Sequence, residues 1–560
     1  MKQKIGILVD STIVSKQLYD LIKLSLKSKN YTVSTLLVND THSYQGSLLS
    51  KTYHYIKKHG FSDFLKISCF KVLCTFEKII VKRSRSKKYS SHANFFDKYN
   101  LSEFDINMIN VTPTISRSGL VCKYNESQLE KIKSQGLNLL VRGGAGILKG
   151  DILTTCPNGV ISFHHGDNNI NRGGPPGFWE VFNRQPRIGF IIQRLNNELD
   201  GGDVLYKGFV STSWMYTLSL IKLYEISNPF LHYVLEDITS GDPKLSIKPK
   251  KPYCYPIYTV PTLHQQLSYI FKTSYCFLTK AIRKLTLKRL RWGVAYQFTE
   301  TWDNVTLWRS KKIPNPKNRF LADPFVVKRN EKYFCFVEDY SYFTSRGSIS
   351  VYEITKDGSK EIGVALTEKF HLSYPYLFEF EGNLYMCPET SEAQDIRVYK
   401  CVEFPLRWEL EKILMKNVSA ADSTVFQKDG KWWLMTNLST SQFGDHCSEL
   451  HLFFSESPLS DNWKPHLQNP VIFDSLTARN GGFICDSDDS YRVHQRQGFD
   501  IFGDALGVSK ITELTNHSYK ENQLFEIEAN FFQGAIGVHT YNYKEGLLVF
   551  DYLETSSYKQ

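Results

Sequence analysis

Short apolar runs alternate with amphipathic segments through the first part of the chain. The runs that predict buried strands lie at 4–10, 33–39, 137–144, 159–165 and 189–195. Between them, apolar positions recur at helical spacing over 14–28 and 125–136. Alternation of strand and helix is typical of a largely parallel sheet with crossover helices, in which ligands bind at the carboxyl ends of the strands.

Two further segments are apolar and basic together. Residues 50–100 interrupt the alternation, contain the basic run 78–88, and predict one or two inserted helices. Residues 262–292 interleave aromatic and aliphatic residues with Lys and Arg, and also predict a helix. Each segment is compatible with a packing helix between domains or with an interfacial helix attracted to anionic lipid.

From about residue 300, a repeated hairpin pattern replaces the helices. Similar segments, each with a strand, a polar turn and a second strand, begin at Ala322, Ser373, Ala421, Ala478 and Gly534. Their spacing of about 50 residues is typical of one four-stranded blade. The pattern therefore favours a five-bladed propeller over the alternative, an irregular β-sandwich.

These patterns predict an α/β Rossmann-like domain followed by an all-β five-bladed propeller. The expected boundaries are 1–240 for the α/β domain, 241–295 for a basic helical linker and 296–560 for the propeller. A chain of 560 residues is too long for one hydrophobic core. Its 14% of aromatic residues agrees with extensive β structure.

The composition restricts the cellular compartment and the binding partners that we expect. Eleven cysteines without C-x-x-C pairs or zinc-finger spacing predict reduced thiols and no metal site. Neither a signal peptide nor a membrane span is expected, so we predict a cytoplasmic protein, free or peripheral to the inner face of the membrane. The net charge of +11 is spread along the chain, and we expect no nucleic-acid partner. The oligomeric state is left open.

The most informative stretch of the first half lies at 159–205. His164 and His165 end a predicted strand, Arg172 follows a polar loop, and Asp200 lies in the turn ELDGGD. A His and an Asp at neighbouring strand ends can transfer a proton near neutral pH. Adjacent histidines are also common as hydrogen-bonded structure, and the residue types alone do not choose between these roles.

The order of these motifs resembles the formyltransferase family, which uses 10-formyltetrahydrofolate and includes sugar N-formyltransferases. The matching elements are SFH at 162–164, a loop ending RGG, GFWEVFN with Trp179, and LDGGDVL from Leu199. The resemblance extends over 1–210 in topology and is specific for 130–210. It implies formyl transfer from 10-formyltetrahydrofolate to a nucleotide- or lipid-linked amino sugar, in cell-surface glycan biosynthesis.

The same resemblance implies roles for individual residues. His164 would relay the proton, Asp200 would hold its ring, and Ser162 stands where the family has an Asn that donates to the oxyanion. Arg172 and Trp179 would contact the substrate. The residues expected to bind the cofactor are Gly143, Gly144, Ala145, Gly146, Ile147, Leu148 and Asp203.

Polar residues begin and end the hairpins of the second half. Asp323, Tyr374, Asp422 and Arg479 lie at the starts, and Glu338, Asp339, Glu389, Asn437 and Gln495 follow the second strands. The inner strands of a propeller line one channel, so we expect these side chains to converge and to bind a sugar substrate. Paired carboxylates suit glycoside chemistry, and Tyr374 and Tyr376 can stack on sugar rings. Capping of turns and hydrogen bonding between blades are the alternative roles.

The second half resembles the propellers of glycoside hydrolase family 43, and more closely the N-terminal domain of plant glucosamine inositolphosphorylceramide transferases. The motifs RFLADPFV, HLSYPYLFE, LYMCPET and YRVHQR carry this resemblance. Three hypotheses follow. The first is a sugar N-formyltransferase whose propeller grips the glycan. The second is a glycosidase or glycosyltransferase propeller attached to an inactive first domain, and the third is a glycan-binding protein without catalysis.

Overall fold

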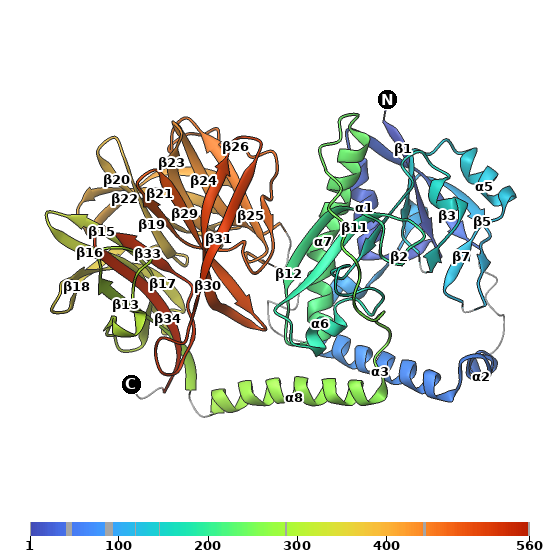
Figure 1. Cartoon of the computed structure of the whole chain (residues 1–560), viewed down its shortest axis with the longest axis horizontal. Coiled ribbons are helices and arrows are strands. Elements are labelled where there is room, and N and C mark those ends of the chain that lie inside the picture. The colour runs from blue at the N-terminus through green and yellow to red at the C-terminus, as the bar shows by residue number, and fades with distance from the viewer. Residues whose placement is uncertain are drawn as a thin grey trace. The chain divides into compact units, whose positions relative to one another are not determined.

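The computed structural model describes residues 2–40, 48–83, 93–117, 119–144, 146–285, 288–440 and 444–557. The chain forms two compact units, Met1–Tyr275 (unit 1) and Cys276–Gln560 (unit 2) (Figure 1). The division falls inside helix α8 (Leu263–Leu285), within the segment predicted as a linker. Ala145 and the end of the basic run, 84–88, lie outside the described residues.

Unit 1 is built on a seven-stranded sheet with the strand order β12-β11-β10-β8-β1-β3-β5. The strands from β10 to β5 are parallel to their neighbours, whereas β11 is antiparallel to both β10 and β12. The seven strands are β1 (Gln3–Val9), β3 (Tyr31–Asn39), β5 (Asn107–Val111), β8 (Leu139–Arg142), β10 (Val160–His164), β11 (Arg187–Arg194) and β12 (Asp203–Ser211). All the strands predicted from apolar runs in this half are confirmed.

The two predicted amphipathic segments, 14–28 and 125–136, form the helices α1 and α5 of unit 1. Helices α1 (Lys16–Leu26) and α7 (Tyr216–Thr239) pack against each other and against the sheet (Figure 1). The other helices are α2 (Leu48–His59), α3 (Phe61–Arg83), α5 (Glu126–Lys133) and α6 (Phe178–Phe182). None of the described helices is long and apolar enough to cross a membrane.

The expected Rossmann-like α/β class is wrong. The chain is mostly β, with 44% of residues in strands and 22% in helices. In unit 1 the sheet is mixed, because β11 is antiparallel to both β10 and β12. Only the short helix α6 lies between β10 and β11, and a 3-10 turn at Asp151–Thr154 lies between the parallel strands β8 and β10. The sequence pattern misled because α1 and α5 do lie between strands and suggested that the same alternation continued.

The described residues of unit 2 form five antiparallel sheets. Three are four-stranded and follow the chain directly: β15 (Arg319–Arg329) to β18 (Ser359–Leu366), β19 (Ser373–Phe380) to β22 (Arg407–Lys416), and β28 (Asn480–Asp486) to β31 (Tyr519–Glu528). A fourth contains β23 (Ala420–Lys428), β24 (Lys431–Leu438), β25 (Glu449–Ser455), β26 (Lys464–Pro465) and β27 (Ile472–Phe473). The fifth contains β13 (Lys288–Phe298), β14 (Lys311–Ile313), β32 (Ala535–Gly537), β33 (Tyr541–Lys544) and β34 (Leu547–Ser557).

The first strands of the sheets contact one another in a closed ring. Strand β15 contacts β19, β19 contacts β23, β23 contacts β28, β28 contacts β33, and β33 contacts β15. The fifth sheet joins both ends of the unit, because β13 pairs with β34 along its whole length. That pairing also corrects one boundary: the helix predicted over 262–292 ends at Leu285, and β13 begins at Lys288.

Candidate functional sites

A wide cleft lies beside the carboxyl ends of β8 and β10 in unit 1. Its volume is about 1940 Å³, and residues of the sheet, of α2 and α3, and of the segment 257–260 line it. Its lining includes Arg142, Ser162, His164 and Asp200. The cleft is also basic, with Lys57, Lys58, Lys66, Lys71, Lys78 and Arg117 among its lining residues.

His164 and Asp200 are brought together in this cleft. Nδ1 of His164 lies 3.2 Å from Oδ2 of Asp200, which also accepts the backbone N–H of Gly173 at 3.0 Å. Nε2 of His164 lies 2.7 Å from the carbonyl oxygen of Asn171. Both ring nitrogens are therefore engaged inside the protein, which is the arrangement of a histidine that fixes a loop rather than one that offers a free nitrogen to a substrate.

His165 points to a different environment. Its ring stacks on Tyr224 at a centroid distance of 3.9 Å and on Phe163 at 4.7 Å. Burial, with a smaller contribution from His164, lowers the pKa of His165 to about 3. The adjacent histidines therefore do not form a common metal-binding pair, and His165 is a neutral packing residue.

Ser162 donates to the carbonyl oxygen of Phe163 at 3.0 Å and accepts Nη1 of Arg142 at 3.2 Å. Arg142 was not predicted as a site residue, although it ends β8 at the cleft. Burial lowers the pKa of Arg142, and the carboxylate of Asp200 opposes this shift. A half-buried guanidinium beside a cleft is suited to bind an anionic group.

The predicted glycine-rich loop packs closely against its surroundings. A Cβ on Gly144 would lie 2.7 Å from Oδ1 of Asp10, and one on Gly146 would lie 2.8 Å from Sγ of Cys122. Gly143 and Ile147 line the cleft, whereas Leu148 is buried in the core. Gly143 and Gly144 are thus closely packed and also line the cleft, and their expected role in binding the cofactor stays a prediction.

The three remaining predicted residues of unit 1 make internal contacts. Arg172 donates from Nε to the carbonyl oxygen of Asn168 at 3.0 Å, and its guanidinium lies over the ring of Tyr253. Trp179 donates from Nε1 to the carbonyl oxygen of Gly174 at 3.3 Å. Asp203 forms an exposed ion pair with Lys250 at 2.8 Å and lies outside the cleft lining.

In unit 2, the residues at the starts of the hairpins occupy equivalent positions. Asp323, Tyr374 and Asp422 each lie at an irregularity where the register of the first strand shifts against the second. Their φ angles are +47°, +44° and +48°, which L-residues adopt at a cost of about 1–3 kcal/mol, most often at functional sites. The shared conformation turns these three residues out of the regular strand pattern.

A network of hydrogen bonds surrounds Asp323. Its Oδ1 accepts the hydroxyl of Thr540 at 2.7 Å, and its Oδ2 accepts the backbone N–H of Tyr374 at 3.2 Å. Oδ1 also lies 3.7 Å from Nδ1 of His539, which pairs with the buried carboxylate of Asp551. The carboxylates of Asp551 and Asp323 outweigh burial and raise the pKa of His539. The ligand atoms of Asp323, His539 and Asp551 lie within 4.8 Å of one another, so the three can also hold a metal ion.

A second network joins the sheets that begin with β19, β23 and β28. Nε of Arg479 donates to Asp422 at 2.6 Å, and its Nη2 lies 3.5 Å from Oε2 of Glu389. Gln495 donates to the same carboxylate of Asp422 at 3.0 Å. Burial raises the pKa of Asp422 to about 6, and Arg479 opposes that rise.

Glu338 completes the acidic cluster. Burial first, and then the carboxylates of Asp323, Glu389 and Asp551, raise its pKa well above the ordinary value. Burial beside other carboxylates thus favours the neutral form of Glu338, and Nε2 of His371 lies 3.6 Å from its Oε1. Asp339, next in the chain, has a separate structural role, because it accepts from Arg319 at 2.5 Å and from Ser350 at 2.7 Å.

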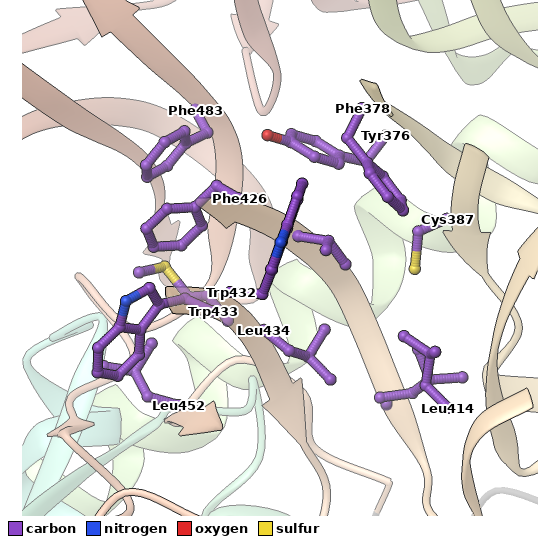
Figure 2. Close-up of a cluster of buried hydrophobic side chains, with 14 of the residues drawn as sticks. Tyr376, Phe378, Cys387, Leu414, Phe426, Trp432, Trp433, Leu434, Leu452 and Phe483 are labelled. Carbon is purple, nitrogen blue, oxygen red and sulfur yellow. The ribbon is translucent and has the colours of Figure 1, made fainter. Parts of the chain in front are cut away.

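The aromatic residues expected to stack on sugars are buried instead. Tyr374 is fully buried, and its hydroxyl lies 3.3 Å from that of Thr424. Tyr376 belongs to the hydrophobic cluster of Figure 2, together with Phe378, Phe426 and Trp432. Neither ring presents a face to solvent, so these tyrosines stabilise the unit rather than contact a sugar. Asn437 likewise donates to two backbone carbonyls and has a structural role.

His539 and Asp551 were missed in the sequence, although the repeat contained a signal for the histidine. In three hairpins, pairing with the second strand resumes at Phe325, Tyr376 and Thr424. The residues two positions earlier are Asp323, Tyr374 and Asp422. Counted in the same way from Tyr541 of the fifth hairpin, the equivalent residue is His539. No such count identifies Asp551, which only the fold brings to Asp323.

Comparison with known proteins gives one consistent match, and it lies in unit 2. Residues 303–544 match the family model described as glucosamine inositolphosphorylceramide transferase 1, N-terminal. The transferase of that name from Arabidopsis thaliana is 37% identical over 222 residues, which cover 38% of this chain and 28% of that protein. The one from Oryza sativa subsp. japonica is 36% identical over 210 residues, covering 37% and 28%. The matched region thus spans less than a third of these relatives.

Similarity to solved structures is weak. A family 117 glycoside hydrolase from Zobellia galactanivorans has a TM-score of 0.31 and 12% identity, covering 46% of this chain and 90% of that one. A sugar N-formyltransferase from Shewanella has a TM-score of 0.28 and 16% identity, covering 48% and 87%. Similarities at this level support no functional argument.

The prediction of a formyltransferase is therefore wrong, both for the family and for the reaction. The family model and the curated relatives name a glucosamine inositolphosphorylceramide transferase, and the formyltransferases are only weak structural neighbours. The family match falls on the half whose motifs resembled that transferase. The expectation that 10-formyltetrahydrofolate binds unit 1 stays a prediction.

Proposed function

We propose that the chain takes part in glycosyl transfer to an inositol-phosphate lipid, and that the acidic cluster of unit 2 performs the reaction. The observation that carries the proposal is the convergence of five carboxyl groups from four sheets, namely Asp323, Glu338, Glu389, Asp422 and Asp551. The region matching the transferase family contains four of these carboxyl groups, Asp323 to Asp422. An amino sugar is the proposed glycosyl group, in keeping with the name of the curated relatives.

Where two carboxyl groups act on a glycosidic bond, one donates a proton to the leaving oxygen and the other is charged. Glu338, whose pKa burial raises, is the proposed acid that protonates the leaving oxygen. Asp422, held by Arg479, is the proposed anion that stabilises positive charge on the sugar ring. Glu389 is partly accessible and lies beside Arg479, which suits it to accept the proton of the attacking hydroxyl.

The experiment incubates the purified chain with nucleotide-linked glucosamine or N-acetylglucosamine and an inositol-phosphate lipid, and detects products by mass spectrometry. Glu338→Gln, which keeps the size of the side chain but cannot donate an acidic proton, is expected to lower the rate about 10²–10⁴-fold. Asp422→Asn is expected to lower it to a similar extent.

The matched control is Glu379→Gln, because Glu379 is an exposed glutamate of the same unit whose ion pair with Arg329 lies outside the acidic cluster. Its rate should equal that of the unchanged chain. Absence of any glycosylated product with all donors and acceptors, or full activity of Glu338→Gln, would refute the proposal. Release of free sugar without an acceptor would instead indicate a glycosidase, the other reaction that paired carboxyl groups support.

A further inference from the structure

Helix α3 and the part of α8 in unit 1 bury polar side chains between them and expose large apolar residues. Glu77 of α3 is buried and accepts the hydroxyl of Tyr269 of α8 and the backbone N–H of Thr217. Gln266 of α8 is buried and donates to the carbonyl oxygens of Lys66 and Pro261, at 2.9 Å and 2.8 Å. The two helices are therefore joined by hydrogen bonds of buried polar side chains.

On α3, those apolar residues form one stripe. Val72 and Phe76 are 69% and 62% exposed, and Ile79 and Ile80 are each 44% exposed. The spacing of four, three and one residues places all four on the same face of a helix. The face that packs inward carries Phe70, Glu77 and Val81 instead.

On α8, a second stripe of exposed apolar residues lies on one face of the helix. Leu267, Ile270, Phe271 and Tyr275 are 67%, 43%, 73% and 57% exposed. The helix continues the spacing with the exposed Leu278. A soluble helix normally buries such a stripe, so these nine exposed apolar residues on two neighbouring helices indicate an interaction surface.

The charges around the stripes indicate the partner. The exposed residues among the stripe of α3 include Lys71, Lys78, Lys82 and Arg83, while the only acidic residue in this half of the helix is the buried Glu77. The sequence of α8 contains neither Asp nor Glu. Two copies of so basic a surface repel each other, whereas anionic lipid headgroups attract it.

We propose that α3 and the beginning of α8 dock unit 1 onto the surface of an anionic lipid bilayer. The apolar stripes enter the boundary between headgroups and acyl chains, and the basic residues contact lipid phosphates. This inference is independent of the proposed reaction, since it rests on helices of unit 1 and predicts binding without substrate.

The cleft of unit 1 extends to this surface. Lys71 and Lys78 border the stripe of α3 and also line the cleft. Phe70 and Cys74 of the same helix line the cleft as well. A lipid-linked ligand would thus have a path from the bilayer into the cleft along α3, with its phosphate beside the lysines.

The experiment is co-sedimentation of the full chain with vesicles of phosphatidylcholine, with and without phosphatidylserine. We expect binding to the anionic vesicles that weakens as salt is raised. The double variant Phe76→Asp and Phe271→Asp should lower the partition coefficient at least tenfold, because two large apolar side chains no longer enter the lipid. Replacing Lys82 and Arg83 by Gln should lower it about fivefold per residue, on anionic vesicles only.

The matched control is Leu26→Asp, which adds the same charge at a 67% exposed apolar position outside α3 and α8. It should bind vesicles like the unchanged chain, and the melting temperature of each variant shows that it is folded. The proposal is overturned if the unchanged chain stays in the supernatant with every vesicle, or if Phe76→Asp with Phe271→Asp binds normally. It is also overturned if that double variant abolishes a dimer while vesicle binding is absent, which would identify a second copy as the occupant.

Discussion

The buried carboxyl groups of the two units have different partners. In unit 2, Arg479 pairs with Asp422, Arg492 pairs with Glu521 at 2.6 Å, and His539 pairs with Asp551. In unit 1, the buried Glu77 and Glu180 are held by neutral donors, a tyrosine hydroxyl and a backbone N–H for the first, and the amide of Asn171 for the second.

The difference supports the proposal that the reactive carboxyl groups lie in unit 2. Burial raises the pKa of Glu77 and of Glu180, and their neutral donors oppose this rise only in part. In unit 2, Arg492 lowers the pKa of Glu521, whereas burial and neighbouring carboxylates raise the pKa of Glu338. Carboxyl groups with pKa values shifted in opposite directions are suited to acid–base chemistry, whereas the basic cleft of unit 1 is suited to bind an anionic ligand.

The largest expected effect tests the paired charges of unit 2. Arg492 is fully buried, and Arg492→Met would leave Glu521 without its cation. We expect the free energy of unfolding to fall by about 3–5 kcal/mol. Denaturant titration followed by tryptophan fluorescence measures it. Arg407→Met is the control, because the pair of Arg407 with Glu409 is exposed and is worth less than about 1 kcal/mol. Equal effects of the two substitutions would remove the contrast between buried and exposed pairs.

A smaller effect tests the neutral carboxyl groups of unit 1. Burial raises the pKa of Glu180 to about 7, so the folded state binds more protons than the unfolded state between about pH 4.5 and 7. Stability present at low pH is therefore lost as the pH rises through 7. Glu180→Gln should remove this loss and raise the melting temperature at pH 8 more than at pH 5. A melting temperature of Glu180→Gln that differs from the unchanged chain by the same amount at both pH values would contradict the assignment.

The smallest expected effect sharpens the contrast between the two sites. His164→Gln should change glycosyl transfer by less than about tenfold, because the imidazole is engaged by Asp200 and Asn171 and the proposed reaction takes place in unit 2. The same assay that detects the loss in Glu338→Gln measures it. A loss in His164→Gln as large as that in Glu338→Gln would move the chemistry to unit 1.

Local patterns predicted much of the secondary structure. The apolar runs identified the strands of the first unit, and the spacing of the hairpins identified the five sheets of the second. Both are properties of short segments, which is why they can be read without tertiary contacts. The antiparallel direction of β11 was not predicted, because strand direction depends on the pairing of distant segments and leaves no mark in the local pattern.

The candidate sites, like the fold, were predicted only in part from the sequence. The repeat by itself determined that Asp323 and Asp422 would stand at equivalent positions, and the motif order determined that His164 and Asp200 would meet. Only the tertiary structure decided that Nε2 of His164 is occupied by a carbonyl oxygen, that Tyr374 is buried, and that Asp551 completes the pair with His539. Sequence periodicity records which side of a strand a residue occupies, but burial and the charge of a neighbour depend on segments brought together from far along the chain.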